Sequence, residues 1–192
     1  NAGIAVVGYV LERRSGEPFA AYLKRSVLQP LGLTSSAFEP EPALVRRLAH
    51  GEMWTLHDRS FDAPNFQLGM SPAGSMYSTM PDLARFMSVL FAGGRGPGGA
   101  VVKAATLDSM WRPQYAPRGA RGGAGLGFQV GALDGRRMVS HGGAIYGFAT
   151  QLAALPDEKL GVAVSAAKDG MNALTDRIAD EALRLMLAAR AG

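Results

Sequence analysis

The sequence predicts an α+β fold, in which a mainly helical part precedes an antiparallel sheet that a final helix closes. Three observations carry this prediction. Apolar residues in the first 124 positions recur mostly at helical spacing, between loops that contain Pro and Gly. From residue 125 they form short alternating runs separated by turn residues, as in strands. Helical spacing then returns at the end of the chain. We therefore divide the chain into residues 1–124, mainly helical with irregular loops, and residues 125–192, a β meander with a closing helix.

The composition is that of a folded protein, with 47% hydrophobic and 19% charged residues among 192. The net charge of +4 is small, and we expect no nucleic acid as a partner. The absence of Cys excludes disulfides, thiol catalysis and Cys-bound metal, but it leaves the compartment open between export and the cytoplasm. No apolar run reaches the roughly 20 residues that cross a bilayer, so we expect no membrane span.

Two helices are expected at the start of the chain. Residues 2–14 are apolar up to a basic end and are followed by Ser15-Gly16, which predicts a buried helix with a glycine stop. Pro18 suits the first turn of a second helix, which we expect from Phe19 to about Val27. The segment Gln29-Pro-Leu-Gly-Leu-Thr34 is expected to break that helix, because Pro and Gly interrupt helical structure.

The middle of the chain is expected to contain an irregular segment and two helices. Residues 35–70 show little periodicity, which predicts an ordered but irregular segment. A helix over residues 80–91 follows a capping residue, Ser78 or Thr79. A short helix over residues 104–111 completes this part.

Four strands and a helix are expected beyond residue 125, over residues 126–133, 136–140, 148–155, 160–166 and 171–188. Asp134-Gly135 is a typical hairpin turn between the first two strands. Four apolar residues of the helix share one stripe, which predicts its inner face. These residues are Leu174, Ile178, Ala182 and Leu185.

A candidate site lies where the second strand is expected to end, at Ser140-His141-Gly142-Gly143. A His there can donate or accept a proton near neutral pH. The two glycines let a ligand approach the backbone closely. Taken alone, the same residues are also compatible with a strand end and a surface His, so the pattern needs support from the rest of the chain.

Three further patterns have simpler explanations. The group His50, His57, Asp58 and Asp62 matches no strong metal signature, and we expect loop polar residues and no bound metal. Residues 93–99 and 118–123 combine Arg with Gly but contain few aromatic residues, which favours mobile loops over RNA contacts. Ser165-Ala-Ala-Lys168 has Ser and Lys three residues apart, but on an expected strand end, where the two side chains do not share a helical face. We therefore do not expect Ser165 to be a nucleophile.

A collinear set of short motifs resembles the β-lactamase-related serine hydrolases, which include class C β-lactamases, DD-peptidases, D-aminopeptidases and esterases. The motifs are Asn1-x-Gly3, Gly16-x-Pro-Phe19, Gln29-Pro-Leu-Gly-Leu33, Ala73-Gly-Ser-Met-Tyr-Ser-Thr79, Asp82-Leu-Ala-Arg-Phe86, Gly125-Leu-Gly-Phe128, His141-Gly-Gly143 and Gly147-Phe148. The resemblance covers nearly the whole chain. It implies a β-lactamase/transpeptidase-like fold, with a mixed sheet, flanking helices and a helical subdomain, of which this chain would be an incomplete version.

The resemblance also implies roles for five residues. Asn1 matches the Asn of the family's Tyr-x-Asn motif and would assist catalysis with His141. Gly142 and Gly143 complete the family's Lys-Thr-Gly or His-x-Gly triad, and the N–H of Ala144 falls where the oxyanion hole is completed. His141 replaces the Lys that suits a β-lactam carboxylate, which weakens the case for β-lactamase activity itself. No metal or cofactor is implied.

The family's Ser-x-x-Lys nucleophile motif and the Tyr before Asn1 have no counterpart in the expected places. We therefore expect the parent protein to be a serine hydrolase that cleaves an ester or amide through an acyl-serine. The substrate would be a β-lactam, a D-amino peptide or a carboxylic ester. The chain alone would be inactive and would need the missing N-terminal segment of the same protein, whose strands would pair with an exposed sheet edge. The alternative is a non-catalytic binding or regulatory protein of the same fold.

Overall fold

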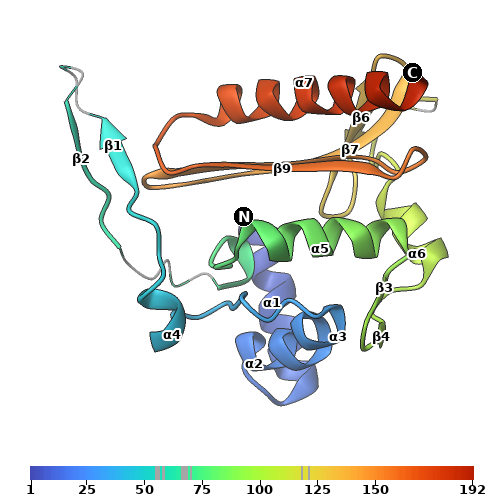
Figure 1. Ribbon diagram of the computed structural model, residues 1–192. Coiled ribbons are helices and arrows are strands. Elements are labelled where there is room, and N and C mark those ends of the chain that lie inside the picture. Colours follow the sequence, from blue (N-terminus) through green and yellow to red (C-terminus); the bar gives the residue numbers. More distant parts are fainter. Residues whose placement is uncertain (55–56, 58, 66–68, 70, 118, 121) are drawn as a thin grey trace.

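The computed structural model describes residues 1–192 except 55–56, 58, 66–68, 70, 118 and 121. A five-stranded antiparallel sheet lies between helix α7 on one face and helix α5 on the other, and the first helices lie beyond α5 (Figure 1). This is the expected α+β architecture of helices around an antiparallel sheet. None of the described helices combines the length and apolar character that crossing a bilayer requires.

The sheet is a meander in the order β5-β6-β7-β8-β9. Its strands are β5 Gly123–Ala124, β6 Gln129–Leu133, β7 Arg136–Ile145, β8 Phe148–Leu155 and β9 Leu160–Ala166. The four expected strands are confirmed, although β6 begins three residues later and β7 continues five residues further. The two-residue β5 was not expected. Asp134 and Gly135 take φ values of 49° and 82°, as a two-residue hairpin turn requires.

Helix α7, Asn172–Ala191, covers one face of the sheet, but the predicted inner face is wrong. Thr175, Ala179 and Leu183 are the buried residues, whereas Leu185 is 70% exposed. Leu174 and Ile178 are also exposed, and Ala182 is half-buried. The small side chains of Thr and Ala let the helix approach the strands closely. Ranking by hydrophobicity favours the stripe with larger residues, which here lies outward.

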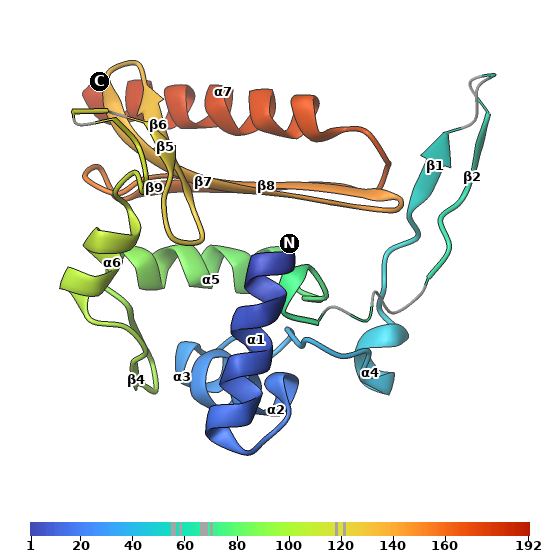
Figure 2. The ribbon, with the colours of Figure 1, turned by 180° about the vertical axis from the view of Figure 1, so that it is seen from behind.

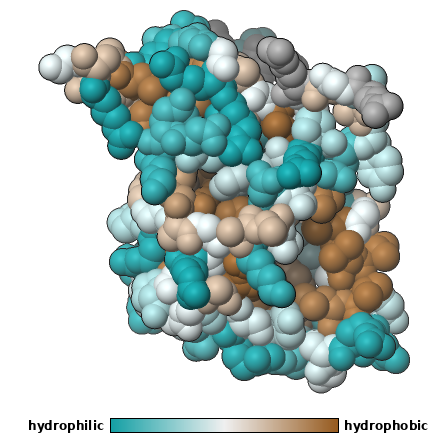
Figure 3. Space-filling model, turned by 90° about the vertical axis from the view of Figure 1, so that its right-hand side faces the viewer, coloured by the Kyte–Doolittle hydropathy of each residue, from teal (hydrophilic) through white to brown (hydrophobic). Residues whose placement is uncertain are grey.

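Helix α1, Ala2–Ser15, is confirmed as a helix and stops at Gly16 with φ 74°, but it is not buried. Large apolar residues between 50% and 61% exposed lie along it. They are Ile4, Val6, Val7, Tyr9 and Val10. Figure 3 shows apolar side chains gathered at the lower right of the face that it presents. Only Gly8 is buried, against Pro72, because the neighbouring elements cover a single side of the helix. The composition predicts an apolar helix but not what covers it.

The second helix does not break at Gln29. It runs through α2, Phe19–Leu23, a π-helical turn η1, Lys24–Leu28, and α3, Gln29–Leu31, and it ends at Gly32 with φ 71°. In the π turn the N–H of Gln29 bonds to the carbonyl of Lys24, five residues back. This wider turn comes immediately before Pro30, which has no N–H to contribute to the helix. The helix therefore continues past Pro30 to Gly32.

Residues 35–70 are more regular than expected within the described parts. They contain the short helix α4, Pro42–Val45, and an antiparallel hairpin of β1, Glu52–Trp54, and β2, Ser60–Asp62. The hairpin projects at the end of the sheet where α7 begins (Figure 1). The prediction of an irregular segment misses it, because strands of three residues leave no periodic signal.

Helix α5, Met80–Phe91, is capped by Thr79, whose Oγ1 accepts from the N–H of Asp82 at 3.3 Å. A 3₁₀ turn, η2, Ser71–Ala73, precedes it. After α5, strands β3, Arg95–Gly96, and β4, Gly99–Ala100, form a small hairpin where a mobile loop was expected. Helix α6, Ala104–Met110, is confirmed. Side chains of α5 and α6 form a core with the second face of the sheet, around Val139 and Ala154.

Candidate active site

The candidate site is the unpaired half of strand β7. Strand β6 pairs with residues 136–140 of β7. The pairing ends where Gln129, the first residue of β6, lies opposite Ser140. Residues 141–145 pair with β8 on one side, and no strand among the described residues pairs with them on the other. Five residues of strand span about 16 Å of open edge. An extended ligand can add to such an edge through backbone hydrogen bonds.

His141 is the first residue of this open half, and its side chain is exposed. It lies on the same face of the sheet as Val139, two positions earlier, which is buried beside α5 and α6. A small pocket on that face is lined by His141 together with Phe86 of α5 and Phe128. The imidazole is therefore at the border between an apolar floor and solvent, within reach of a ligand on the edge.

Gly142 and Gly143 follow in the strand. A Cβ on Gly143 would lie 2.5 Å from Oγ1 of Thr150, and one on Gly142 would lie 3.2 Å from Oε1 of Gln151. Larger residues would thus displace the side chains of the neighbouring strand β8. Ala144 comes next, opposite Ala149 in the register, and is exposed. This part of the edge is almost bare backbone.

Asn172 fixes the carbonyl of Gly143, a contact that the sequence analysis did not identify. Its Nδ2 donates to the Gly143 oxygen at 2.9 Å from the first residue of α7. The two residues are 29 positions apart. No spacing motif links them, so only the fold brings them together.

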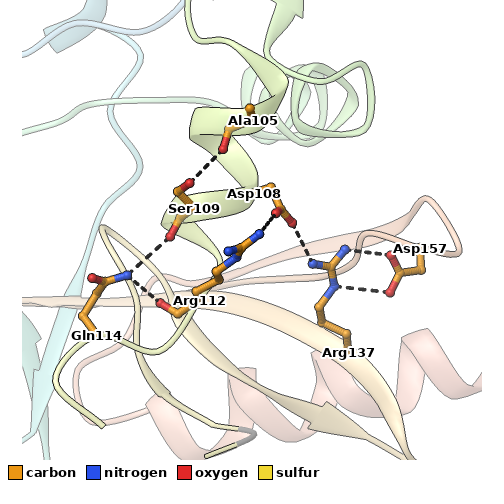
Figure 4. A network of polar contacts seen from close by, with 7 residues as sticks. All are labelled: Ala105, Asp108, Ser109, Arg112, Gln114, Arg137 and Asp157. Carbon is orange, nitrogen blue, oxygen red and sulfur yellow. Dashed lines mark hydrogen bonds and ion pairs between the residues drawn. The ribbon is translucent and has the colours of Figure 1, made fainter. Parts of the chain in front are cut away.

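The other end of β7 is anchored by ion pairs. Arg137 contacts Asp157 at 2.7 Å and Asp108 of α6 at 3.3 Å (Figure 4). Its guanidinium also lies 5.7 Å from the centre of the Trp111 ring. These carboxylates raise the pKa of Arg137, while Arg112 and Arg137 lower the pKa of Asp108. The first half of the strand is therefore held between β6, α6 and the β8–β9 turn.

Asn1 precedes α1 and is exposed, and its side chain makes no capping hydrogen bond. In Figures 1 and 2 the N-terminal end of α1 is the end nearer to the sheet. Asn1 and the His-Gly-Gly strand thus belong to separate elements, and the predicted roles of Asn1, His141 and the residues that follow it remain predictions.

Ser165 lies in strand β9, opposite Thr150, and Lys168 lies beyond the end of the strand. The two residues therefore do not lie on one helical turn. This agrees with the expectation that they do not share a helical face. Asp58, one of the four polar residues that were considered as a metal group, lies outside the described residues. Arg118 and Arg121 of the second Arg-Gly segment also lie outside them. Within the described parts of the chain, no group of three His, Asp or Glu side chains is arranged to hold a metal ion.

Known proteins share the sequence pattern and the fold of this chain. A family model described as Beta-lactamase matches residues 1–185. Beta-lactamase-like protein 2 of Dictyostelium discoideum is 26% identical over 168 residues, which cover 86% of this chain and 30% of that protein. The chain spans about a third of the length of the curated relatives it matches.

Two solved structures are also similar. The octameric penicillin-binding protein homologue from Pyrococcus abyssi superposes with a TM-score of 0.83 at 25% identity, over 97% of this chain and 41% of that one. The D-amino acid amidase from Ochrobactrum anthropi SV3, solved with L-phenylalanine amide, gives a TM-score of 0.79 at 21% identity. That match covers 98% of this chain and 56% of the amidase, and at this identity it shows a shared fold alone.

Proposed function

This chain belongs to the beta-lactamase family, and on that premise we propose that the protein carrying it hydrolyses an ester or amide through a covalent acyl-serine. The observation that carries the proposal is the half-paired strand β7, which presents an exposed His141 and two glycines along an open edge. A serine nucleophile from another segment of the same protein would attack a carbonyl held along this edge. The substrate would be a β-lactam, a D-amino peptide or a carboxylic ester.

In this proposal the backbone of the edge binds and orients the substrate. Gly142 and Gly143 let the substrate come close, and the N–H of Ala144 donates to the developing oxyanion. Loss of one such donor costs roughly 2.7–4 kcal/mol of transition-state stabilisation. His141 and Asn1 would hydrogen-bond the substrate or pass a proton near the reacting carbonyl. The carbonyl of Gly143 is kept in place by Asn172, so that this part of the strand holds its position while the acyl group is bound.

We propose further that another segment of the same protein covers the apolar surfaces of this chain. The exposed apolar side chains of α1 and of the outward stripe of α7, with Leu185 at 70% exposure, are surfaces of the kind that another segment or a partner usually covers. Strand β9 is an edge of the sheet and offers a row of backbone groups for pairing. The length of the relatives supports a partner segment within one polypeptide. On this basis the chain alone would be inactive.

A fluorophosphonate probe, applied to the whole protein and to the isolated chain, tests the proposal. We expect one labelled serine in the whole protein, at a position outside this chain, and none in the isolated chain. Mutation of His141 to Ala should lower kcat/KM by about 10²-fold if the imidazole takes part in proton transfer. The matched control, His50→Ala, changes a loop histidine and should leave kcat/KM unchanged. A label on Ser165, or no labelled serine in the whole protein, would overturn the proposal, and the second result would favour a non-catalytic member of the family.

A further inference from the structure

The β1–β2 hairpin is attached to the connection between β9 and α7, residues 167–171. The N–H of Glu52 donates to the carbonyl of Ala167 at 3.1 Å. The N–H of Asp169 donates back to the carbonyl of Glu52 at 2.8 Å. These two bonds form a parallel bridge between Glu52 and Lys168, so the hairpin begins as an extension of the body of the protein.

Side chains strengthen this attachment, and we call Glu52, Trp54, Lys168 and Asp169 the clasp. Nζ of Lys168 lies 3.0 Å from Oε2 of Glu52 and 3.8 Å from the centre of the Trp54 ring. The indole Nε1 of Trp54 donates to the carbonyl of Asp169 at 3.1 Å. One ammonium group therefore serves a carboxylate and an aromatic face at the same time, which joins both ends of strand β1 to the connection.

The clasp adjoins the open half of β7 at two points. The turn that follows this half packs against the base of the hairpin, where a Cβ on Gly147 would lie 2.4 Å from Cβ of Ala63 and 2.9 Å from the Gly51 backbone. The connection that carries Lys168 continues into α7, whose first residue, Asn172, holds the carbonyl of Gly143. The hairpin thus stands at the far end of the edge that begins at His141 (Figure 1).

We propose that Lys168 is a positioning residue, which fixes strands β1 and β2 and their base at Gly51 and Ala63 as the end wall of the substrate-binding edge. A ligand chain that extends along residues 141–145 would meet this wall at the β7–β8 turn. A small acyl group near His141 would not. The clasp thereby sets how well an extended, peptide-like substrate is held, and this role rests on the proposed hydrolase function.

The test compares Lys168→Met with Lys168→Arg in the whole protein, with Lys159→Met as a matched control in the β8–β9 turn. We expect Lys168→Met to raise KM for peptide amides of three or four residues by about 5-fold, because the variant loses both the cation–π contact with Trp54 and the ion pair with Glu52. Its kcat, and both constants for a small aryl acetate, should stay the same, and Lys168→Arg should restore KM. Equal changes for long and small substrates, or no change for either, would overturn the proposal.

Amide hydrogen exchange provides a readout that needs no activity. In Lys168→Met the amides of Glu52 and Asp169 should exchange about 5-fold faster, while Lys168→Arg and Lys159→Met should match the parent protein. Unchanged exchange in Lys168→Met would refute the clasp. Absence of a labelled serine in the whole protein would instead refute the hydrolase function, and the substrate role with it, while exchange would still decide whether Lys168 holds the hairpin.

Discussion

Replacing the buried Asp82 should lower the free energy of unfolding more than replacing an exposed charged residue in the first half of the chain. The Asp82 residue is 3% exposed and lies in the first turn of α5. Its Oδ2 accepts from the N–H of Ser35 at 2.8 Å and from Oγ of Ser36 at 2.7 Å. Arg85, at 3.3 Å from Oδ1, has a side chain that is 47% exposed. The carboxylate thus ties the loop after α3 to the helix that covers the sheet.

The magnitude follows from these contacts. A hydrogen bond to a charged acceptor contributes about 1.5–3 kcal/mol, and a carboxylate near a helix N-terminus adds about 0.3–1 kcal/mol. In Asp82→Ala the hydroxyl of Ser36 keeps Ser78 as a partner at 2.8 Å, whereas the N–H of Ser35 loses its carboxylate acceptor. The exposed Arg85 contributes little. We therefore expect Asp82→Ala to lower the free energy of unfolding by about 3–4 kcal/mol, and Asp82→Asn by about half as much.

Urea unfolding of the whole protein, followed by circular dichroism, measures both values. Arg85→Ala serves as the control and should cost less than about 1 kcal/mol, since an exposed ion pair is screened by water. If Asp82→Ala fell within about 1 kcal/mol of the parent protein, or if Arg85→Ala cost as much as Asp82→Ala, the buried network would not have the importance that we assign to it.

Three other predictions concern the site and its surroundings. Asn172→Ala should lower kcat/KM about 2- to 10-fold, the equivalent of one neutral hydrogen bond, and unchanged kinetics would contradict its role. In urea unfolding, Gly147→Ala should lower the free energy of unfolding by at least about 1 kcal/mol more than Gly135→Ala does. Both glycines have positive φ, but only Gly147 is packed against backbone atoms. Equal losses would show that this packing is unimportant. The hydrogen bond and charge of Lys168 lower the pKa of Glu52. The Glu52–Lys168 ion pair should therefore be intact at pH values above the ordinary pKa of Glu, and it should be lost as the pH falls through the lowered pKa. Amide exchange at Glu52 against pH measures this, and an identical profile in Lys168→Met would contradict it.

The features that were correctly predicted depend on neighbouring residues. Asp134-Gly135 specifies a two-residue turn through its own backbone preferences, and Thr79 caps the helix that starts at the next residue. Gly16 ends α1 for the same kind of local reason. The turn at Asp134-Gly135 also sets the register of β6 on β7, which in turn leaves His141 just beyond the paired region.

The errors concern contacts between distant residues. The β1–β2 hairpin contacts Lys168, which is 116 positions away from Glu52, and three-residue strands leave no signal of their own. The inner face of α7 depends on how closely the helix approaches the sheet, which favours Ala179 over the larger Ile178. Asn172 was missed because an Asn at the start of a helix is usually explained as a local polar residue. Burial and partners of this kind follow from the assembled fold.

The open half of β7 also bears on self-association of the protein. An unpaired strand edge is a template for pairing with other chains, and long apolar edges favour aggregation. Here two of its five residues are glycines, which leave the backbone accessible to an extended ligand but offer no side chains for a dry interface between chains. The two glycines at 142 and 143 should therefore weaken side-chain packing between copies of the protein at the edge where a substrate is expected to bind.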